Sequence, residues 1–197
     1  MRPPNPPGVG KRCREREGVK VRKGKLFVVS GPSGVGKGTL LSHVLDRLDN
    51  IRFSVSATTR PPREGEEEGV HYFFVSPPQF QDMIRKGEFL EWAEVHGHHY
   101  GTPRKFVDRI RDEGQDVILD VDVKGMRSVR GKVSEAIAIF IQPPDFQELR
   151  RRLEGRHTEK GVEIEQRLRN AQEEIRASAE YDHVVINDHL ERRKCQD

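Results

Sequence analysis

The sequence has few cysteines and few aromatic residues, and it contains no long apolar run. Two cysteines occur among the 197 residues, Cys13 and Cys195, and neither has a second cysteine nearby. This spacing indicates neither a disulfide framework nor a cysteine zinc site, and it favours a reducing, cytoplasmic location. No apolar run reaches the length of a membrane span, and nothing near Met1 resembles a secretory signal. We therefore expect no membrane partner.

The histidines are not spaced as a common zinc site requires. The tract His96-Gly97-His98-His99 matches no common zinc spacing and has no cysteine or fourth ligand beside it. We interpret it as a loop that leads into Tyr100.

Positive charge is concentrated at the N-terminus. Residues 1–25 hold nine Lys or Arg and two Glu, a net charge of +7, while the whole chain carries +3, which leaves −4 for the rest. The basic balance therefore gives no support for nucleic-acid binding by the fold itself. Residues 1–23 contain four prolines and almost no apolar side chains, which predicts a basic disordered extension. We favour a dispensable tail over an arm that contacts nucleic acid or a partner.

The rest of the chain alternates between strand and helix patterns. Short β-branched apolar runs predict buried strands at 26–30, 117–122, 136–141 and 184–186. Apolar residues at helical spacing predict helices at 37–48, 106–113, 146–154 and 164–177. This alternation predicts an α/β fold with a mostly parallel sheet. A polar and aromatic segment between them predicts an insert, with short strands at 53–56, 72–75 and 89–92 and a helix near 80–86.

A glycine-rich loop follows the first predicted strand. Residues 31–37 read GPSGVGK, which matches the G-x-x-x-x-G-K pattern of a phosphate-binding loop between a strand and a helix. The glycines let backbone N–H groups point at phosphate oxygens, and Lys37 supplies a cation. Gly38 occupies the place of the usual Mg²⁺-binding Ser or Thr, and the hydroxyl comes one residue later at Thr39. This variant is similar to the loop of adenylate kinases and implies Mg²⁺ held through phosphate oxygens and water.

The phosphate loop alone does not distinguish between an ATPase, a GTPase, a kinase and a motor protein. A second motif narrows this choice: residues 54–66 read SVSATTRPPREGE, followed by GVHYFF at 69–74, FLEW at 89–92 and YGT at 100–102. Together with the phosphate loop, these segments resemble the guanylate kinase family over about residues 25–190. His71 departs from the family pattern, which usually has Asp there.

The resemblance implies a P-loop NTPase-type parallel sheet core with helices on both faces, a small mixed α/β GMP-binding insert and a helical lid. It divides the chain into an extension (1–23), a kinase domain (24–190) and a short tail (191–197). Within the domain it implies a core made of residues 24–52, 104–144 and 180–190. The insert is residues 53–103, and the lid is residues 145–179.

The implied reaction is the phosphorylation of GMP, and of dGMP, by ATP with Mg²⁺, in a monomer or homodimer that needs no nucleic acid. One alternative is a non-catalytic guanylate-kinase-like scaffold that binds a phosphopeptide. Such domains typically have a degraded phosphate loop, whereas Gly31, Gly36 and Lys37 are intact here. A weaker alternative is an enzyme for AMP or a pyrimidine monophosphate.

The chemistry of GMP agrees with the residues at the matching positions. Its phosphate needs fixed cations and hydroxyls, its guanine N1–H and N2–H₂ need an acceptor, and O6 or N7 needs donors. Glu91 is the acceptor, and AMP would leave it unpaired. Taken singly, Arg60 and Arg63 would be interpreted as solvated surface arginines. Glu91 would be a carboxylate on the face of a strand, and the tyrosines would be core residues. The residues that the resemblance assigns to GMP are Ser56, Arg60, Arg63, Tyr72, Glu91, Tyr100, Thr102 and Asp122.

The remaining assignments concern ATP. Alternation predicts that Asp120 and Asp122 lie on one face at the end of a strand, where Asp120 would organise Mg²⁺-bound water with no direct protein ligand. Two loop-capping aspartates are the alternative. A run of arginines usually indicates a solvated helix face, but the resemblance implies a lid that closes over ATP. It assigns catalysis to Lys37, Arg60, Asp120, Arg156 and Arg167. It assigns ATP binding to Gly31, Pro32, Ser33, Gly34, Val35, Gly36, Lys37, Gly38, Thr39, Arg152 and Arg156.

Overall fold

The structure is a computed structural model that describes residues 22–155 and 161–188. Most of the expected N-terminal extension and the whole tail at 191–197 lie outside these ranges, as does Arg156.

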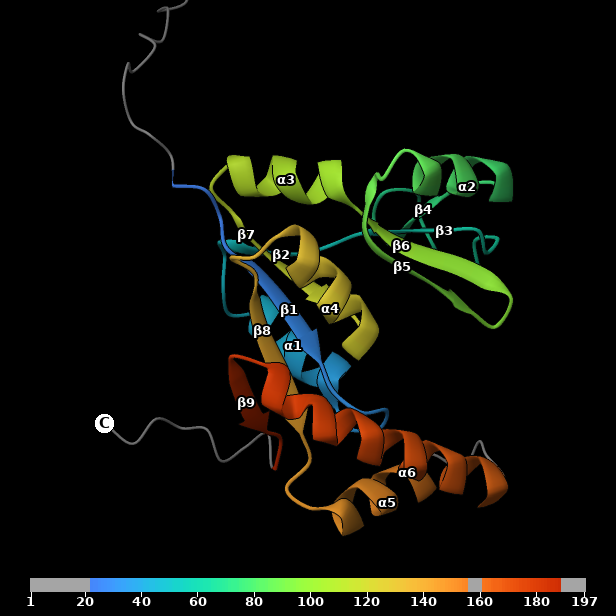
Figure 1. The fold of residues 1–197 in the computed structure, drawn as a ribbon, viewed down its shortest axis with the longest axis vertical. Helices are drawn as coiled ribbons and strands as arrows, with labels where there is room; N and C mark the ends of the chain where they lie inside the picture. The colour runs from blue at the N-terminus through green and yellow to red at the C-terminus, as the bar shows by residue number, and fades with distance from the viewer. Residues whose placement is uncertain (1–21, 156–160, 189–197) are drawn as a thin grey trace, which may run out of the picture.

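Five parallel strands form the core sheet, in the order β2-β7-β1-β8-β9 (Figure 1). They are β1 (Leu26–Ser30), β2 (Ile51–Phe53), β7 (Asp116–Asp120), β8 (Ile137–Gln142) and β9 (His183–Ile186). β1 lies at the centre, where Phe27 pairs with Ile118 on one side and Ile137 on the other. The predicted parallel α/β sheet is confirmed.

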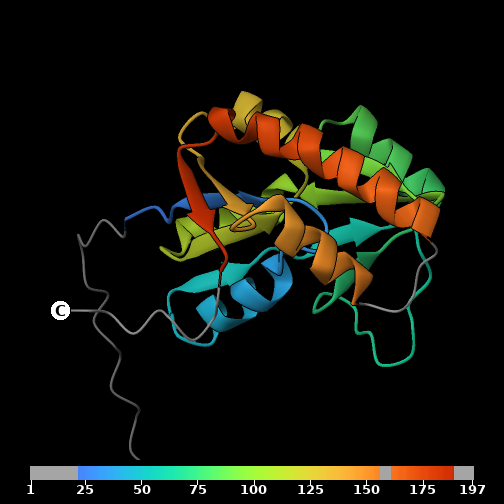
Figure 2. The same ribbon diagram turned by 90° about the horizontal axis from the view of Figure 1, so that it is seen from below.

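Helices cover both faces of this sheet, as predicted (Figure 2). Helix α1 (Lys37–Leu45) packs on one face, where Leu41 joins Val29 and Ile118 in an apolar cluster. Helices α3 (Arg104–Asp112) and α4 (Val123–Lys132) pack on the other face through Val107, Met126 and related side chains. Helix α4 was absent from the sequence prediction.

A second sheet of four strands forms a separate layer with helix α2 (Pro77–Arg85), in the order β4-β3-β6-β5. Its strands are β3 (Ser56–Thr58), β4 (Tyr72–Phe74), β5 (Phe89–Val95) and β6 (His98–Pro103). The sheet is mixed, since β3 pairs parallel with β4 and antiparallel with β6. The predicted strand at 53–56 is wrong, because Phe53 ends β2 of the core sheet and Ser56 begins β3 here.

The histidine tract forms a hairpin rather than the expected loop. His96 and Gly97 have φ values of 51° and 76° and form the two-residue turn between β5 and β6, with Val95 opposite His98. Two positive φ angles are the requirement of a tight hairpin turn, and glycine meets it without strain. Nowhere in residues 22–155 and 161–188 do three or more His, Cys, Asp or Glu gather as metal ligands.

Two further helices, α5 (Phe146–Glu154) and α6 (Gly161–Arg176), lead into the short 3₁₀ helix η1 (Ala177–Glu180). Leu149, Leu153 and Leu168 join them in a small apolar cluster of their own. These helices and the four-stranded sheet project from the same side of the core (Figure 1). No helix in the described ranges has the length and apolarity to cross a membrane.

Candidate active site

The phosphate loop joins the carboxyl end of β1 to the first turn of α1. Gly36 has φ 88° and forms the N-cap of α1, so Lys37 is the first residue of the helix. Gly34 has φ 85°, and a Cβ there would lie 2.7 Å from a methyl carbon of Leu153 in α5. The loop therefore needs glycine both for its backbone conformation and for contact with the α5–α6 unit.

Lys37 and Asp120 face each other across the end of the sheet. The Lys37 ammonium lies 2.6 Å from an Asp120 carboxylate oxygen, and both side chains are partly exposed. Asp120 ends β7, the strand beside β1, so two adjacent strands bring the pair together. A phosphate that reaches Lys37 competes with Asp120 for the ammonium.

A cavity of about 460 Å³ lies over the phosphate loop. Its walls are Gly31 to Thr39, the segment Asp120 to Asp122, and Glu174 of α6. Burial raises the pKa of Glu174, and the charge of Lys37 opposes that shift. Sequence reasoning missed Glu174, because nothing in the pattern of α6 distinguishes it from the other glutamates there. We call this cavity the donor cavity.

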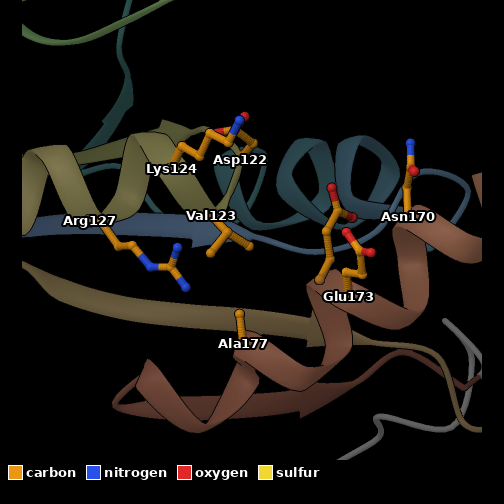
Figure 3. Close-up of a pocket in the computed structure, with 8 residues that line it drawn as sticks. Asp122, Val123, Lys124, Arg127, Asn170, Glu173 and Ala177 are labelled. Atoms are coloured by element: carbon orange, nitrogen blue, oxygen red, sulfur yellow. The ribbon is translucent and has the colours of Figure 1, made fainter.

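A neighbouring cavity of about 420 Å³ separates α4 from α6 (Figure 3). It shares Asp122 and Glu174 with the donor cavity. Lys124 and Arg127 line it from α4, and Asn170 and Glu173 from α6. Mixed charges of both signs define no single ligand chemistry, so we treat this space as the gap between the two helices.

A further cavity of about 330 Å³, the acceptor cavity, lies between the second sheet and the core. Five of its lining residues were assigned to GMP from the sequence: Ser56, Tyr72, Glu91, Tyr100 and Asp122. His71, the residue that departs from the family pattern, also lines it. The rings of Tyr72 and Tyr100 meet edge to face, with centroids 6.0 Å apart.

Glu91 is the buried carboxylate of this cavity. Its residue is 8% exposed, and its carboxylate accepts a hydrogen bond of 2.5 Å from the Thr102 hydroxyl. Burial raises the pKa of Glu91, whereas the Thr102 hydrogen bond opposes the shift. The single hydroxyl hydrogen of Thr102 is committed to Glu91 here, so Thr102 orients the carboxylate in this structure rather than presenting a donor to the cavity.

Ser54 was not singled out from the sequence. Its residue is 5% exposed, it lines the acceptor cavity, and its hydroxyl has no hydrogen-bond partner among the described residues. A buried hydroxyl without a partner is costly, which makes Ser54 a candidate ligand contact.

Arg60 does not line the acceptor cavity itself, but its guanidinium carbon lies 5.3 Å from the centre of the ring of Tyr72, which does. Glu66 holds it there through a hydrogen bond of 2.8 Å, and Glu66 also accepts from the backbone N–H of Arg63. The Arg60 hydrogen bond is the largest cause that lowers the pKa of Glu66 to about 2. The Arg63 side chain is exposed and does not line the cavity.

The prediction that Asp120 and Asp122 lie on one face of a strand is wrong for Asp122. Strand β7 ends at Asp120, and the chain turns so that Asp122 becomes the N-cap of α4. Its carboxylate accepts from the Gly125 N–H at 2.7 Å, as a helix N-cap does. It still lines both the donor and the acceptor cavities.

Two of the arginines predicted for a lid, Arg152 and Arg167, contact the phosphate loop. Arg167 donates to the Ser33 hydroxyl at 3.3 Å. Arg152 donates to the Val35 carbonyl at 3.2 Å and to the carbonyls of Asn187 and Asp188. Asn187, which sequence reasoning did not select, donates to the same Val35 carbonyl at 2.8 Å. The loop is therefore tied to α5, α6 and the segment after β9.

The residues at the donor cavity are compatible with Mg²⁺ bound together with a nucleotide. Thr39, Asp120 and Asp122 provide oxygen donors, which Mg²⁺ prefers. Gly38 adds no hydroxyl at the position after Lys37. This donor set is too small to enclose the ion, so phosphate oxygens and water would complete its coordination.

A phosphate loop after the central strand of a parallel sheet defines a P-loop nucleotide-binding protein, and the adjoining cavity lined by Tyr72, Tyr100 and Glu91 offers space for a second ligand. The guanylate kinase family model matches residues 23–196. A guanylate kinase of Thermotoga maritima is 50% identical over 86% of this chain and 82% of its own length. That of Halalkalibacterium halodurans is 50% identical over 88% of this chain and 85% of its own length. The chain belongs to the guanylate kinase family.

A solved structure agrees with this membership. The crystal structure of guanylate kinase from Anaplasma phagocytophilum has a TM-score of 0.60 and 36% sequence identity to this chain. The match covers 84% of this chain and 78% of that one.

Proposed function

We propose that this chain transfers the γ-phosphoryl group of ATP to GMP, giving ADP and GDP. The observation that carries the proposal is a shared wall: Asp120, Val121 and Asp122 line both the donor cavity and the acceptor cavity. Two phosphate groups, one in each cavity, would meet beside Lys37. We propose dGMP as a second acceptor, since the selected residues address the phosphate and the base and none addresses the ribose 2′-hydroxyl.

The chemistry at this wall is alignment and charge neutralisation. A GMP phosphate oxygen is already anionic, so no general base or covalent nucleophile is needed. Lys37 neutralises charge on the β- and γ-phosphates once ATP displaces Asp120 from it. Arg60, with Tyr72 and Tyr100, holds the acceptor phosphate, and the exposed Arg63 would join them only by turning toward the cavity. Mg²⁺, held by phosphate oxygens and Asp120 through water, would add neutralising charge on the ATP phosphates.

Glu91 selects the base in this proposal. A buried carboxylate accepts from guanine N1–H and N2–H₂, and adenine has no N1 proton to donate. Ser56 and the unpartnered Ser54 supply donors for O6 or N7, while Thr102 keeps Glu91 oriented.

Helices α5 and α6 act as the lid in this proposal, with Arg152, Arg156 and Arg167 directed at ATP. Arg156 lies outside the described residues, so its part rests on the family resemblance. We further propose the division of 24–190 into core, insert (53–103) and lid (145–179), a cytoplasmic location, and a monomer or homodimer that needs no nucleic acid.

The phosphopeptide-binding scaffold is not favoured. Gly34, Gly36 and Lys37 are all in place, and Lys37 is the first residue of α1. Curated relatives at 50% identity are guanylate kinases.

The test is a coupled ADP-release assay with GMP, dGMP, AMP, UMP and IMP, combined with Lys37→Ala. We expect GMP and dGMP to be used best, and we expect Lys37→Ala to lower kcat by about 10²-fold or more while GMP binding persists. The matched control is Lys105→Ala, an exposed lysine paired with Glu88 on the surface. Wild-type turnover in Lys37→Ala, or equal use of AMP and GMP, would refute the proposal.

A further inference from the structure

Strand β5, which carries Glu91, contains an irregularity next to that residue. Phe89 pairs with Pro103 and Trp92 pairs with Gly101, so three steps along β5 oppose two steps along β6. One extra residue therefore lies between Phe89 and Trp92, as in a β-bulge. Bulges change the direction in which nearby side chains point, and this one includes Glu91.

Helix α4 holds this bulge by its last turns. The Lys132 ammonium donates to the carbonyls of Phe89 and Leu90, both at 2.9 Å. The Ser128 hydroxyl donates to the Leu90 carbonyl, also at 2.9 Å. Successive carbonyls of a regular strand point in opposite directions, so one ammonium reaches both because of the bulge. β5 is an edge strand, and α4 takes the place of a further strand beside it.

Lys132 contacts β5, whereas Arg130, the other cation in the last turn of α4, does not. Arg130 is directed away from β5, toward the Glu180 carbonyl and the Asp182 carboxylate near β9. Lys132 is the cation of α4 that acts on Glu91, and it favours the charged carboxylate there.

From this geometry we infer that Lys132 is a positioning residue for guanine recognition: it fixes the β5 bulge so that Glu91 points into the acceptor cavity as a carboxylate. The inference rests on the proposed function, because it assigns a source to the base selectivity that the proposal gives to Glu91. Lys132 does not touch the nucleotide in this account and acts only through Glu91 and its strand.

The electrostatic setting of Glu91 supports this assignment. Burial raises the pKa of Glu91, the neighbouring Asp122 raises it further, and Lys132 lowers it. The other titratable groups of the acceptor cavity are His71, Tyr72, Tyr100 and Asp120. Loss of the Lys132 charge therefore moves the pKa of Glu91 upward. Since guanine needs the ionised form, GMP use would then fail at a higher pH than in the wild type.

The experiment compares Lys132→Met, Lys132→Arg and Ser128→Ala with the wild type. For Lys132→Met we expect the KM for GMP to rise about tenfold, the effect of losing one hydrogen bond between guanine and the misplaced Glu91 carboxylate, with kcat and the KM for ATP within about twofold. Lys132→Arg should recover most of the loss. Ser128→Ala removes a hydrogen bond to the same Leu90 carbonyl without changing charge, so it should raise the KM less and leave the pH profile unmoved.

Two readouts separate positioning from general destabilisation. The acidic limb of kcat/KM for GMP should move to higher pH in Lys132→Met alone. The preference for GMP over IMP should fall, because IMP lacks the N2 amine that a well-aimed Glu91 accepts. This ratio is taken on one protein sample, so partial unfolding of a variant cancels from it.

An unchanged GMP-to-IMP preference and pH profile in Lys132→Met would overturn the inference, even if the variant is less stable. Equal losses for GMP and ATP that follow a fall in Tm would do the same. These outcomes leave wild-type GMP phosphorylation intact, whereas a wild-type enzyme without that activity would overturn the proposed function first and this inference with it.

Discussion

Replacement of Glu91 by Gln should lower GMP use without lowering stability. The side chain is buried and retains one acceptor oxygen after the change, so one guanine N–H would face an amide NH₂ instead of a carboxylate oxygen. The lost interaction is a hydrogen bond to a charged group, roughly 1.5–3 kcal/mol. That range lowers kcat/KM for GMP by about 10- to 150-fold. The KM for ATP should not change.

The stability of Glu91→Gln should move in the opposite direction. Because burial raises the pKa of Glu91 above its unfolded value, the ionised form is disfavoured in the folded protein. The wild type therefore loses stability as pH rises through the folded-state pKa, and the neutral glutamine does not. We expect the variant to match or exceed the wild type in free energy of unfolding at pH 7. Below about pH 4, where glutamate is protonated even when unfolded, this advantage should disappear.

The assays are steady-state kinetics with GMP and ATP, and urea unfolding at both pH values. Glu94→Gln is the matched control, an exposed carboxylate on the same strand, and neither quantity should change in it. A GMP kcat/KM within about threefold of wild type would refute base recognition by Glu91. A large loss of stability of Glu91→Gln at pH 7 would refute the inference that the buried charge of Glu91 destabilises the folded protein.

Two further predictions concern the acceptor arginine and the phosphate loop. Glu66→Gln should raise the KM for GMP, because Arg60 loses its carboxylate partner. The pKa of Glu66 is lowered to about 2, so the ionised carboxylate contributes stability to the wild type. This contribution should be lost in the wild type as pH falls from about 4.5 toward 2, whereas the variant has no such contribution to lose. An identical acid-unfolding curve for the two proteins would count against that pairing. Gly34→Ala should lower the free energy of unfolding by roughly 1–3 kcal/mol, since φ is 85° and Leu153 lies 2.7 Å from the new Cβ. Gly38→Ala, in helix α1 with nothing within 4 Å, should raise that free energy by up to about 1 kcal/mol in the same urea titration. Equal effects of the two alanines would contradict the close contact between the loop and α5.

The strands and helices with strong periodicity could be predicted from sequence. The run at 26–30 became β1 without change, and 146–154 became α5 with the predicted ends. Helix α4 could not be found in this way, because its ten residues include Gly125 and Gly131. Glycine disfavours a helix, but a Cβ at Gly125 would lie 2.9 Å from the Cβ of Val121. The residue is therefore set by close packing, which local propensity does not reveal.

The site residues divide in the same way. Motif spacing selected Lys37, Glu91 and Tyr100, because each belongs to a short pattern with a chemical reason. Glu66 and Lys132 were missed, since their importance comes from hydrogen bonds that the folded structure provides. Ser54 was missed because its importance comes from the burial of a hydroxyl without a partner, which the sequence does not show. The error at Asp122 has a related cause: alternation assumes that a strand continues, whereas here a helix begins.

Helix α4 joins the two halves of the proposed reaction. Its N-cap, Asp122, lies in the wall common to the donor and acceptor cavities. Its last residue, Lys132, holds the strand that carries Glu91. Phosphate alignment and base selection therefore depend on opposite ends of one helix of ten residues, about 15 Å long. Because Met126 and Val129 anchor α4 in the core cluster, a correctly placed guanine and a correctly placed acceptor phosphate follow from the same packing against the sheet.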